Sequence, residues 1–332
     1  MKEEEIRPKK LMDKQKEMYM KDITNLLKRK KEFVNVNCPA CESDNYEKSL
    51  EKYNLTYVIC KECGTMFVNP RPTLKILNEY YTNSKNYKYW NEVIFPTSEN
   101  IRRMKIFKPR AERIAEICKH YKIKTNIIVD VGAGFGTFCE EINKMKIFNK
   151  AIAVEPIPYL AETCRKKKLE VIEKQIEKVK FDYNIDVVTS FETIEHLYSP
   201  KDFLLGCKKI LSENGFIIIT CPNIYGFDIS TLKELSDSID TEHLNYFNPN
   251  SLSRLLSNCG FEIIEISTPG KLDAELVRKS ILKEEFNVDS QPFLKRVLID
   301  GWELYKESFQ KFLTDNLLSS HLWIVAKNKK EG

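Results

Sequence analysis

The chain has 332 residues, of which 42% are hydrophobic and 30% charged, a composition typical of a folded globular protein. Its longest apolar runs are far too short to cross a bilayer, which argues against a protein that inserts into a membrane. The net charge is +5, and the first 32 residues carry 11 basic and 7 acidic side chains, so the remainder is close to neutral and lacks the basic stripe typical of nucleic-acid enzymes.

Residues 1–32 form a charged segment whose apolar side chains recur at helical spacing. Tyr19, Ile23 and Leu26 would share one face, so we predict an N-terminal helix. The basic run that follows at 28–31 is either a solvated helix end or a contact for an acidic surface. Because no apolar segment typical of a secretory signal follows Met1, we expect a cytoplasmic protein.

Residues 33–72 contain two Cys-x-x-Cys pairs that are separated by 18 residues. The four cysteines are Cys38, Cys41, Cys60 and Cys63. This spacing places four thiolates around one Zn²⁺, and a site in which all four ligands come from the protein is structural. We therefore predict a small zinc module, which needs this metal crosslink to fold. The other six cysteines lie among apolar neighbours and are expected in the core.

Residues 73–124 are predicted to form a helical linker or lid. The expected helices span Thr73–Tyr81 and Ser98–Tyr121, and the second is kinked or divided at Pro109. Five aromatic residues at positions 80–90 would either stack on a sugar or nucleobase or fill an interface between the zinc module and the core. Among them, Tyr87 is expected beside the cofactor site.

From residue 125 to the end of the chain, strands alternate with helices, which is the pattern of a parallel α/β sheet covered on both faces. We predict a Rossmann-like seven-stranded mixed sheet. The expected strands are Ile127–Val131, Ala151–Glu155, Glu170–Glu173, Asp186–Ser190, Phe216–Thr220, Phe261–Ser267 and Leu322–Lys327. The expected helices are Thr137–Met145, Pro158–Lys167, Lys201–Leu211 and Asn250–Cys259. Residues 268–319 read as a helical insertion that serves as a lid or substrate cap.

A glycine-rich turn directly follows the first of these strands and opens a helix. It begins with Asp130 and contains Gly132, Gly134 and Gly136, which permit a tight turn and a close approach of the backbone to a ligand. Glu155 ends the next strand, where a carboxylate can accept hydrogen bonds from both ribose hydroxyls. The Gly-x-Gly-x-Gly spacing and the acid before it suit a cationic ligand better than a pyrophosphate.

These residues resemble the first two motifs of class I S-adenosylmethionine-dependent methyltransferases. The segment from Asp186 to Leu197 and the Leu211–Gly215 turn resemble later motifs, especially those of ubiquinone-type O-methyltransferases. The resemblance covers roughly residues 125–268 and the last strand. It implies S-adenosylmethionine as cofactor. The cofactor contacts that it implies are Asp130, Gly132, Gly134, Gly136, Glu155, Gln175, Ile176, Phe191 and Glu192.

The zinc module through Pro72 is similar to modules that precede the core of methyltransferases acting on nucleotide-linked sugars and surface-polysaccharide precursors. This resemblance implies a hydroxyl of a sugar nucleotide or glycan precursor as the acceptor. Two alternatives remain open: an RNA methyltransferase that uses the zinc module for recognition, and a scaffold that binds the cofactor without catalysis. The sugar C-methyltransferases of that group carry a further C-terminal domain, which a chain of this length cannot hold.

Methyl transfer to a hydroxyl or carbon acid requires a group that removes a proton. His196 follows the fourth strand at the sheet edge where α/β folds bind ligands, and Glu242 and His243 lie in the loop after the fifth strand. An adjacent Glu-His pair resembles the acid–base residues of sugar C-methyltransferases. We predict that His243, His196 and Glu242 are catalytic, with structural hydrogen bonding as the alternative for each histidine, and that His120 and His321 are structural.

Overall fold

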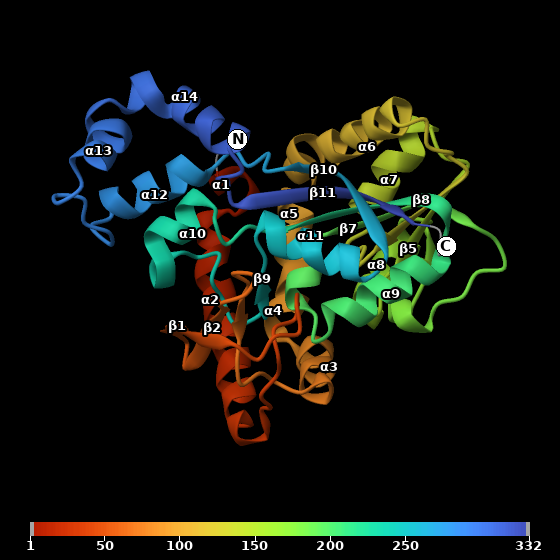
Figure 1. Ribbon diagram of the computed structural model, residues 1–332, viewed down its shortest axis with the longest axis horizontal. Helices are drawn as coiled ribbons and strands as arrows, with labels where there is room; N and C mark the ends of the chain where they lie inside the picture. Colours follow the sequence, from red (N-terminus) through yellow and green to blue (C-terminus); the bar gives the residue numbers. More distant parts are fainter. Residues whose placement is uncertain (1–2, 330–332) are drawn as a thin grey trace.

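The computed structural model describes residues 3–329 and is built around a seven-stranded sheet in the order β10-β11-β8-β7-β4-β5-β6 (Figure 1). Strand β11 is antiparallel to both of its neighbours, and the pairs among β4–β8 are parallel. The strands are β4 (Ile127–Val131), β5 (Lys150–Val154), β6 (Glu170–Ile172), β7 (Ile185–Phe191), β8 (Leu211–Pro222), β10 (Phe261–Ser267) and β11 (His321–Asn328). This mixed sheet confirms the predicted fold class.

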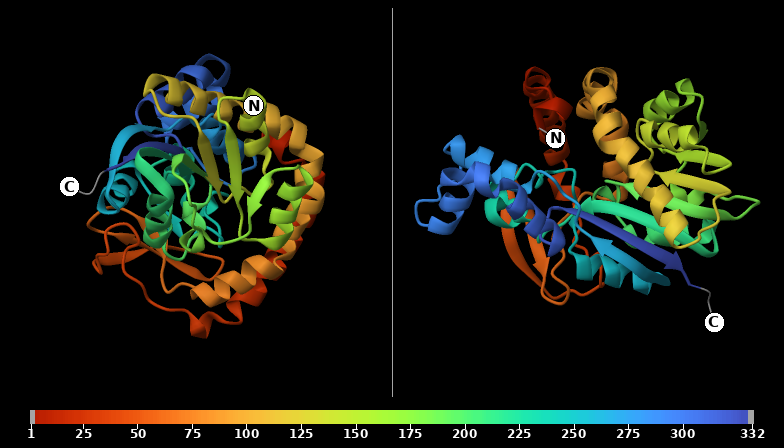
Figure 2. Two further views of the ribbon diagram at one scale, coloured as in Figure 1. Left: turned by 90° about the vertical axis from the view of Figure 1, so that its right-hand side faces the viewer. Right: turned by 90° about the horizontal axis from the view of Figure 1, so that it is seen from above.

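Both faces of the sheet are buried, because successive side chains along a strand point to opposite sides. Ile128 packs in one apolar cluster with Ile114 and Phe138, while its neighbour Val129 packs in the other with Phe203. The covering helices are α6 (Lys108–His120), α7 (Thr137–Met145), α8 (Pro158–Lys166), α9 (Pro200–Ile210) and α11 (Pro249–Asn258). Two views of these layers are shown in Figure 2.

The cysteine-rich segment forms a second, four-stranded sheet in the order β1-β2-β3-β9. Its strands are β1 (Tyr46–Lys52), β2 (Leu55–Cys60), β3 (Met66–Val68) and β9 (Asn245–Tyr246). The last strand belongs to the long loop after β8, and Tyr246 pairs with Met66. The sheet therefore crosses the predicted boundary at residue 72, and it attaches the cysteine module directly to the loop that carries His243.

Arg71 fixes this attachment from within the protein. Its side chain is 1% exposed, and its guanidinium donates to the backbone carbonyls of Val68, Tyr198 and Leu244 over 3.2–3.4 Å. No carboxylate within residues 3–329 forms an ion pair with it. Burial lowers the pKa of Arg71 to about 10, which still leaves the group charged at neutral pH. The hydrogen bonds of this one side chain thus link three segments: the cysteine module, the residues after β7 and the residues before β9.

We expect Arg71→Met to destabilise the protein by roughly 2–4 kcal/mol, because three buried carbonyls lose their donor while the apolar stem is kept. Urea unfolding followed by tryptophan fluorescence measures this difference. Arg71→Lys, which retains the charge but loses the planar fork, should show an intermediate loss. An unfolding midpoint of Arg71→Met equal to that of the wild type would contradict this anchoring role.

The N-terminal helices run along one side of the molecule (Figure 2). They are α1 (Glu3–Ile6), α2 (Lys9–Leu27), α3 (Leu74–Asn83), α4 (Lys85–Tyr89) and α5 (Phe95–Arg102). The Asp22 carboxylate joins α2 to α4 by accepting hydrogen bonds from the Ser84 hydroxyl and from the backbone N–H of Asn86, both at 2.8 Å. π-helical turns at Trp90–Ile94 and Arg103–Phe107 link α4, α5 and α6. The helical region predicted to begin at Ser98 therefore begins at Phe95. Pro109 lies in the first turn of α6, where the N–H that proline lacks would have no helical partner.

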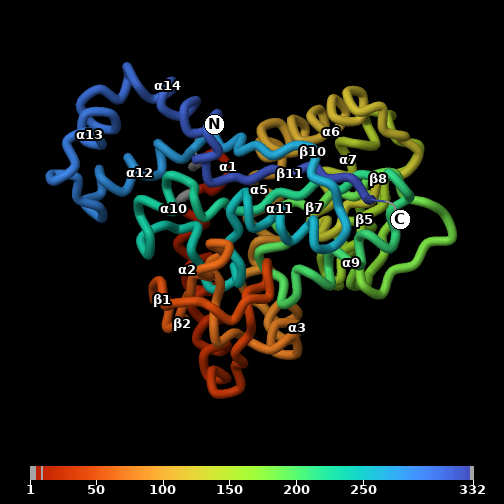
Figure 3. The backbone as a smooth tube through the Cα atoms, in the orientation of Figure 1, coloured from red at the N-terminus to blue at the C-terminus, as the bar shows by residue number. Residues whose placement is uncertain are grey.

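The predicted insertion at 268–319 is helical and lies at one end of the molecule (Figures 1 and 3). Its helices are α12 (Asp273–Leu282), α13 (Pro292–Lys295) and α14 (Trp302–Asp315), which pack with α10 (Phe227–Leu232) around a small core. Val277 and Leu298 are fully buried there. Across residues 3–329, every helix falls short of the length and apolar character needed to span a bilayer.

Candidate functional site

A cleft of about 1600 Å³ opens where the carboxyl ends of β4, β5, β6 and β7 meet α3 and α4. Of the predicted site residues, the cleft is lined by Tyr87, Gly132, Gly134, Glu155, Gln175, Ile176, Glu192 and His196. Five predicted site residues do not line the cleft: Asp130, Gly136, Phe191, Glu242 and His243. No residue of the 268–319 insertion lines it either, so within the described part of the chain the insertion is not positioned as a wall of this cleft.

The glycine turn after β4 depends on residues without side chains. Gly132, Gly134 and Gly136 all have positive φ, between 54° and 77°. A Cβ at Gly132 would lie 2.4 Å from the Thr193 hydroxyl, whereas a Cβ at Gly134 would meet nothing within 4 Å. The backbone at Gly134 therefore faces open space in the cleft, and a ligand can approach it closely.

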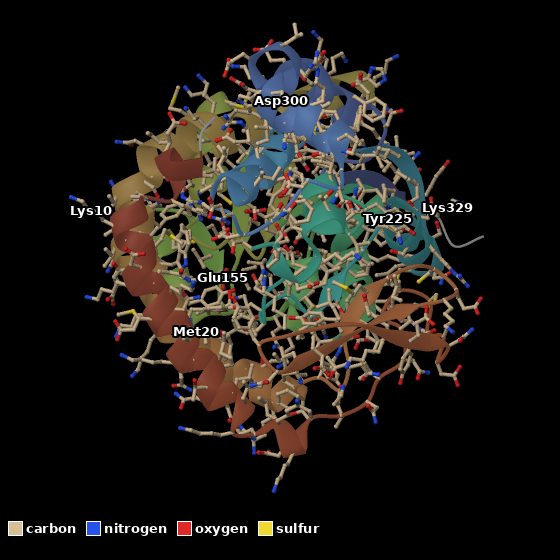
Figure 4. All side chains as sticks on the ribbon, turned by 90° about the vertical axis from the view of Figure 1, so that its left-hand side faces the viewer. Lys10, Met20, Glu155, Tyr225, Asp300 and Lys329 are labelled. Carbon is tan, nitrogen blue, oxygen red and sulfur yellow. The ribbon has the colours of Figure 1, made fainter. Side chains whose placement is uncertain are left out.

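Two acids support this turn. Glu155, labelled in Figure 4, is 3% exposed, and its carboxylate accepts from the backbone N–H of Gly134 at 2.8 Å and of Ile157 at 2.9 Å. Asp130 accepts from the Thr189 hydroxyl at 2.8 Å beneath the turn. Burial raises the pKa of each of these two carboxyl groups to about 7.

If Glu155 holds the ribose of S-adenosylmethionine, as the resemblance implies, these raised pKa values predict that binding of the cofactor weakens at acidic pH. A protonated Glu155 cannot accept from both ribose hydroxyls, so the dissociation constant should rise roughly tenfold per pH unit as pH falls below 7. Calorimetric titrations at pH 8 and pH 6 test this expectation. Glu155→Gln should show a flatter pH dependence, and equal wild-type affinity at the two pH values would rule the linkage out.

Glu192 directly follows β7 and has a left-handed conformation with φ of 51°. Its carboxylate accepts from the Thr220 hydroxyl at 2.6 Å and lies 3.2 Å from the Arg110 guanidinium and 3.3 Å from His321 Nδ1. Burial opposes ionisation, but the charges of His321 and Arg110 lower the pKa of Glu192 below its ordinary value. The sequence reading missed Arg110 and assigned His321 a structural role. Neither residue lies near Glu192 in the chain, so no local pattern signals these contacts.

His196 and His243 approach each other, with ring centres 4.6 Å apart. His196 Nδ1 lies 3.0 Å from the carbonyl of Glu242, and His243 Nδ1 lies 3.0 Å from the carbonyl of Ser238. Because a carbonyl accepts only, each Nδ1 carries a hydrogen, and in the neutral ring Nε2 is then the atom with the lone pair. Burial lowers the pKa of His196 to about 3, so its ring is neutral at physiological pH.

The carboxylate of Glu242 points away from these rings, toward the N-terminal helices. It accepts from the Tyr80 hydroxyl at 2.7 Å and from the Asn86 side-chain amide at 3.1 Å. Burial raises the pKa of Glu242 to about 8. The structure thus gives this residue contacts that position the loop, and its predicted catalytic role stays a prediction. Tyr80 and Asn86 were missed because more than 150 residues separate them from Glu242.

The four predicted metal ligands converge at one end of the cysteine module. Cys38 and Cys63 have their sulfurs 3.5 Å apart, as do Cys41 and Cys60, and all four sulfurs lie within 4.8 Å of one another. Tetrahedral zinc with Zn–S bonds of about 2.3 Å spaces its sulfurs by roughly 3.8 Å. All ten cysteines are free thiols. The donor set and its spacing therefore fit one zinc ion.

Comparison with known proteins places these features in a family. Residues 101–266, half of the chain, match the family model described as a methyltransferase domain. The ubiquinone biosynthesis O-methyltransferase of Azoarcus sp. (strain BH72) is 23% identical over 199 residues, which are 54% of this chain and 80% of that protein. The mitochondrial ubiquinone biosynthesis O-methyltransferase of Dictyostelium discoideum is 28% identical over 137 residues, covering 36% of this chain and 42% of that protein.

Among solved structures, a complex of the Haloferax volcanii Trm112 methyltransferase activator with a methyltransferase matches 74% of this chain and 98% of the other, with a TM-score of 0.50 and 14% identity. An S-adenosylmethionine-dependent methyltransferase from Archaeoglobus fulgidus matches 71% of this chain and all of the other, with a TM-score of 0.47 and 20% identity. At these identities, the likeness concerns the fold alone.

Proposed function

Because the chain belongs to the methyltransferase-domain family and is an S-adenosylmethionine-dependent methyltransferase, we propose that it methylates a hydroxyl of a small molecule, namely a sugar nucleotide or surface-glycan precursor. The observation that carries this proposal is the shared cleft. The open backbone of Gly134 and the Glu155 carboxylate line it together with His196, so cofactor and acceptor groups face one space.

On the cofactor side, Glu155 would accept from the ribose hydroxyls, and the Gly132–Gly136 turn would hold the methionine part, with Asp130 ordering the turn from below. Gln175 and Ile176 line the cleft after β6, where they suit adenine. Glu192 would attract the cationic end of the ligand, since nearby charges keep it ionised. When bound, S-adenosylmethionine supplies an electrophilic methyl group.

On the acceptor side, His196 lines the cleft and, as a neutral ring of low pKa, would accept a hydrogen bond from the hydroxyl through Nε2. His243, whose ring centre lies 4.6 Å from that of His196, would take the proton. The hydrogen bonds of Nδ1 to the carbonyls of Glu242 and Ser238 fix both rings in this orientation. The contacts of Glu242 to Tyr80 and Asn86 would then position His196 through the backbone. Tyr87 lines the same cleft and offers an apolar face to an acceptor or cofactor ring.

We further propose that the four cysteines hold a structural zinc ion. Zinc would join the turn before β1 to the turn between β2 and β3, and β3 pairs with β9 only two residues after His243. The metal would thereby stabilise the loop that presents His243 rather than take part in methyl transfer.

Support for the acceptor class comes from three sides. The cysteine module resembles those of sugar-modifying methyltransferases, the Azoarcus and Dictyostelium relatives are named O-methyltransferases, and residues 33–332 are close to neutral. A cleft of about 1600 Å³ is also large enough to take a nucleotide-linked acceptor beside the cofactor.

Incubation of the purified protein with S-adenosylmethionine and a panel of nucleotide sugars tests the proposal, with mass spectrometry to detect a gain of one methyl group. We expect a methylated product whose rate falls at least roughly 100-fold in His243→Ala. His120→Ala, which removes an exposed histidine far along α6, is the matched control and should act like the wild type. Methylation of RNA but of no sugar nucleotide would replace the acceptor proposed here.

A further inference from the structure

Asp240 and His243 form an acid–histidine pair in the loop that leads into β9. A carboxylate oxygen of Asp240, Oδ2, lies 3.6 Å from His243 Nδ1. The same Nδ1 lies 3.0 Å from the carbonyl oxygen of Ser238, so two oxygen atoms face the hydrogen that Nδ1 carries. The side chains of His243 and Asp240 are 17% and 24% exposed, and partial burial strengthens the interaction of a carboxylate with an imidazole.

The backbone of the loop fixes the carboxylate of Asp240 relative to this ring. Its other oxygen, Oδ1, accepts hydrogen bonds from the backbone N–H of Glu242 at 2.9 Å and of His243 at 2.8 Å. Aspartate and asparagine both close turns of this kind, because each has a side-chain oxygen at the required distance. One oxygen of Asp240 therefore closes the turn, and the other faces the histidine ring.

The cysteine module holds the backbone of Asp240 from both sides. The Tyr57 hydroxyl donates to the Asp240 carbonyl at 2.6 Å, and the Asp240 N–H donates to the Tyr246 hydroxyl at 3.0 Å. Both tyrosines are fully buried, and they belong to β2 and β9 of the four-stranded sheet. Strand β2 ends at Cys60, one of the four clustered cysteines, so a short path of bonds leads from that cluster to Asp240.

Two other acids near the histidines have different surroundings. Glu195 is 1% exposed, and neither of its carboxylate oxygens has a hydrogen-bond partner among the described residues. Burial and the charge of Glu192 raise the pKa of Glu195 well above its ordinary value, which favours the neutral form. Glu192 itself is paired with Arg110 at 3.2 Å. Asp240 is thus the acid whose carboxylate is placed to pair with His243.

We propose that Asp240 is a positioning residue that orients His243 for proton transfer, and that the cysteine module holds Asp240 in place. This inference rests on the proposed function, in which His243 takes the proton of the acceptor hydroxyl. An acid that faces one nitrogen of a histidine fixes the ring and its tautomer, and it stabilises the cation that forms when the other nitrogen takes up a proton.

The reaction balances with these groups. The hydroxyl proton passes to the His243 ring, which becomes a cation beside the Asp240 carboxylate. The acceptor oxygen keeps the electron pair of its O–H bond and forms a bond to the methyl carbon. The carbon–sulfur bond breaks, and its electron pair remains on sulfur. The positive charge lost from sulfur is thus the charge gained by the histidine.

Asp240→Asn tests this role because it separates the charge from the turn. Asparagine keeps an oxygen that can close the turn, but it places an amide donor or an uncharged oxygen opposite the Nδ1 hydrogen. Nuclear magnetic resonance of ¹⁵N-histidine in the zinc-loaded full chain, without cofactor or acceptor, reports which ring nitrogen carries the hydrogen. The signals of His243 are those absent from His243→Gln. We expect the hydrogen on Nδ1 in the wild type and a shift toward Nε2 in Asp240→Asn.

The kinetic expectation is a fall in kcat of roughly 30-fold or more in Asp240→Asn, with KM within about twofold of the wild type. Tyr57→Phe should show a smaller fall in kcat, since it loosens the acid without removing it. Asp237→Asn changes an exposed aspartate of the same loop and should match the wild type in both measurements. If Asp240→Asn fails to fold, Asp240→Ser, which also keeps an oxygen for the turn, replaces it with the same kinetic expectation.

An unchanged tautomer of His243 in Asp240→Asn, or an unchanged kcat, would overturn the positioning role. A loss that lies in KM alone would overturn it as well, because it would place Asp240 in acceptor binding. The resonance measurement needs neither cofactor nor acceptor. A shifted tautomer combined with no methylated acceptor from the wild type would therefore refute the proposed function and leave the pairing of Asp240 with His243 standing.

Discussion

Glu155→Ala is expected to weaken the binding of S-adenosylmethionine more than 100-fold. In the proposed complex its carboxylate accepts from two ribose hydroxyls, and hydrogen bonds to a charged group contribute about 1.5–3 kcal/mol each. The same carboxylate accepts from the Gly134 N–H at 2.8 Å, so its removal also releases the glycine turn. Calorimetric titration measures the affinity, and a thermal melt confirms that the variant is folded.

The matched control for this prediction is Glu162→Ala. Glu162 is an exposed acid on α8 whose recorded partner is Arg165, so its loss should leave the affinity within about twofold. An affinity of Glu155→Ala within threefold of the wild type would show that the acid after β5 does not bind the cofactor. The cofactor site proposed around the glycine turn would then lose its main polar contact.

Cys60→Ser is expected to remove most of the bound zinc and to lower the melting temperature by several degrees. Structural zinc contributes folding free energy directly, and a hydroxyl is a poor replacement for a thiolate ligand. The damage should reach the acceptor region, because β3 pairs with β9 close to His243. Metal analysis by atomic absorption and a methyl-transfer assay measure the two effects, and we expect both to fall together.

Cys118→Ala provides the control, since it removes a buried thiol of α6 that lies outside the four-cysteine cluster. It should retain one zinc per chain and its methyl-transfer activity, apart from a modest loss of stability. Full zinc content in Cys60→Ser, or zinc-free wild-type protein that melts at the same temperature as the loaded form, would contradict a structural metal at this position.

Local patterns in the sequence predicted much of the catalytic core. The predicted strand at Ile127–Val131 and helix at Thr137–Met145 have the bounds found in the structure. The apolar residues of each segment recur with a single period, and a clear change in the sequence pattern marks where each segment ends. The acid–glycine–acid spacing likewise identified residues that line the cleft, including Gly132, Gly134 and Glu155. Strand β8 is longer than predicted, from Leu211 to Pro222, since its pairing with β7 and β11 extends beyond the apolar run.

Contacts between distant segments could not be predicted in the same way. The pairing of β9 with β3 joins residues about 180 positions apart, and β9 is only two residues long. The contacts of Glu242 to Tyr80 and of Glu192 to Arg110 also join distant segments, across 162 and 82 positions. Glu195 was noted only as the neighbour of His196, because a missing hydrogen-bond partner is visible only in three dimensions.

The central claim is that this cleft transfers a methyl group from S-adenosylmethionine to a small hydroxylated acceptor. The most direct measurement is the transfer of labelled methyl from S-adenosylmethionine into an extract of the source cells, separated into small molecules and polymers. We predict label in the nucleotide-sugar or glycan-precursor fraction, lost when His243→Ala replaces the wild type. Label confined to RNA, or label in no fraction with folded, zinc-loaded protein, would contradict this account.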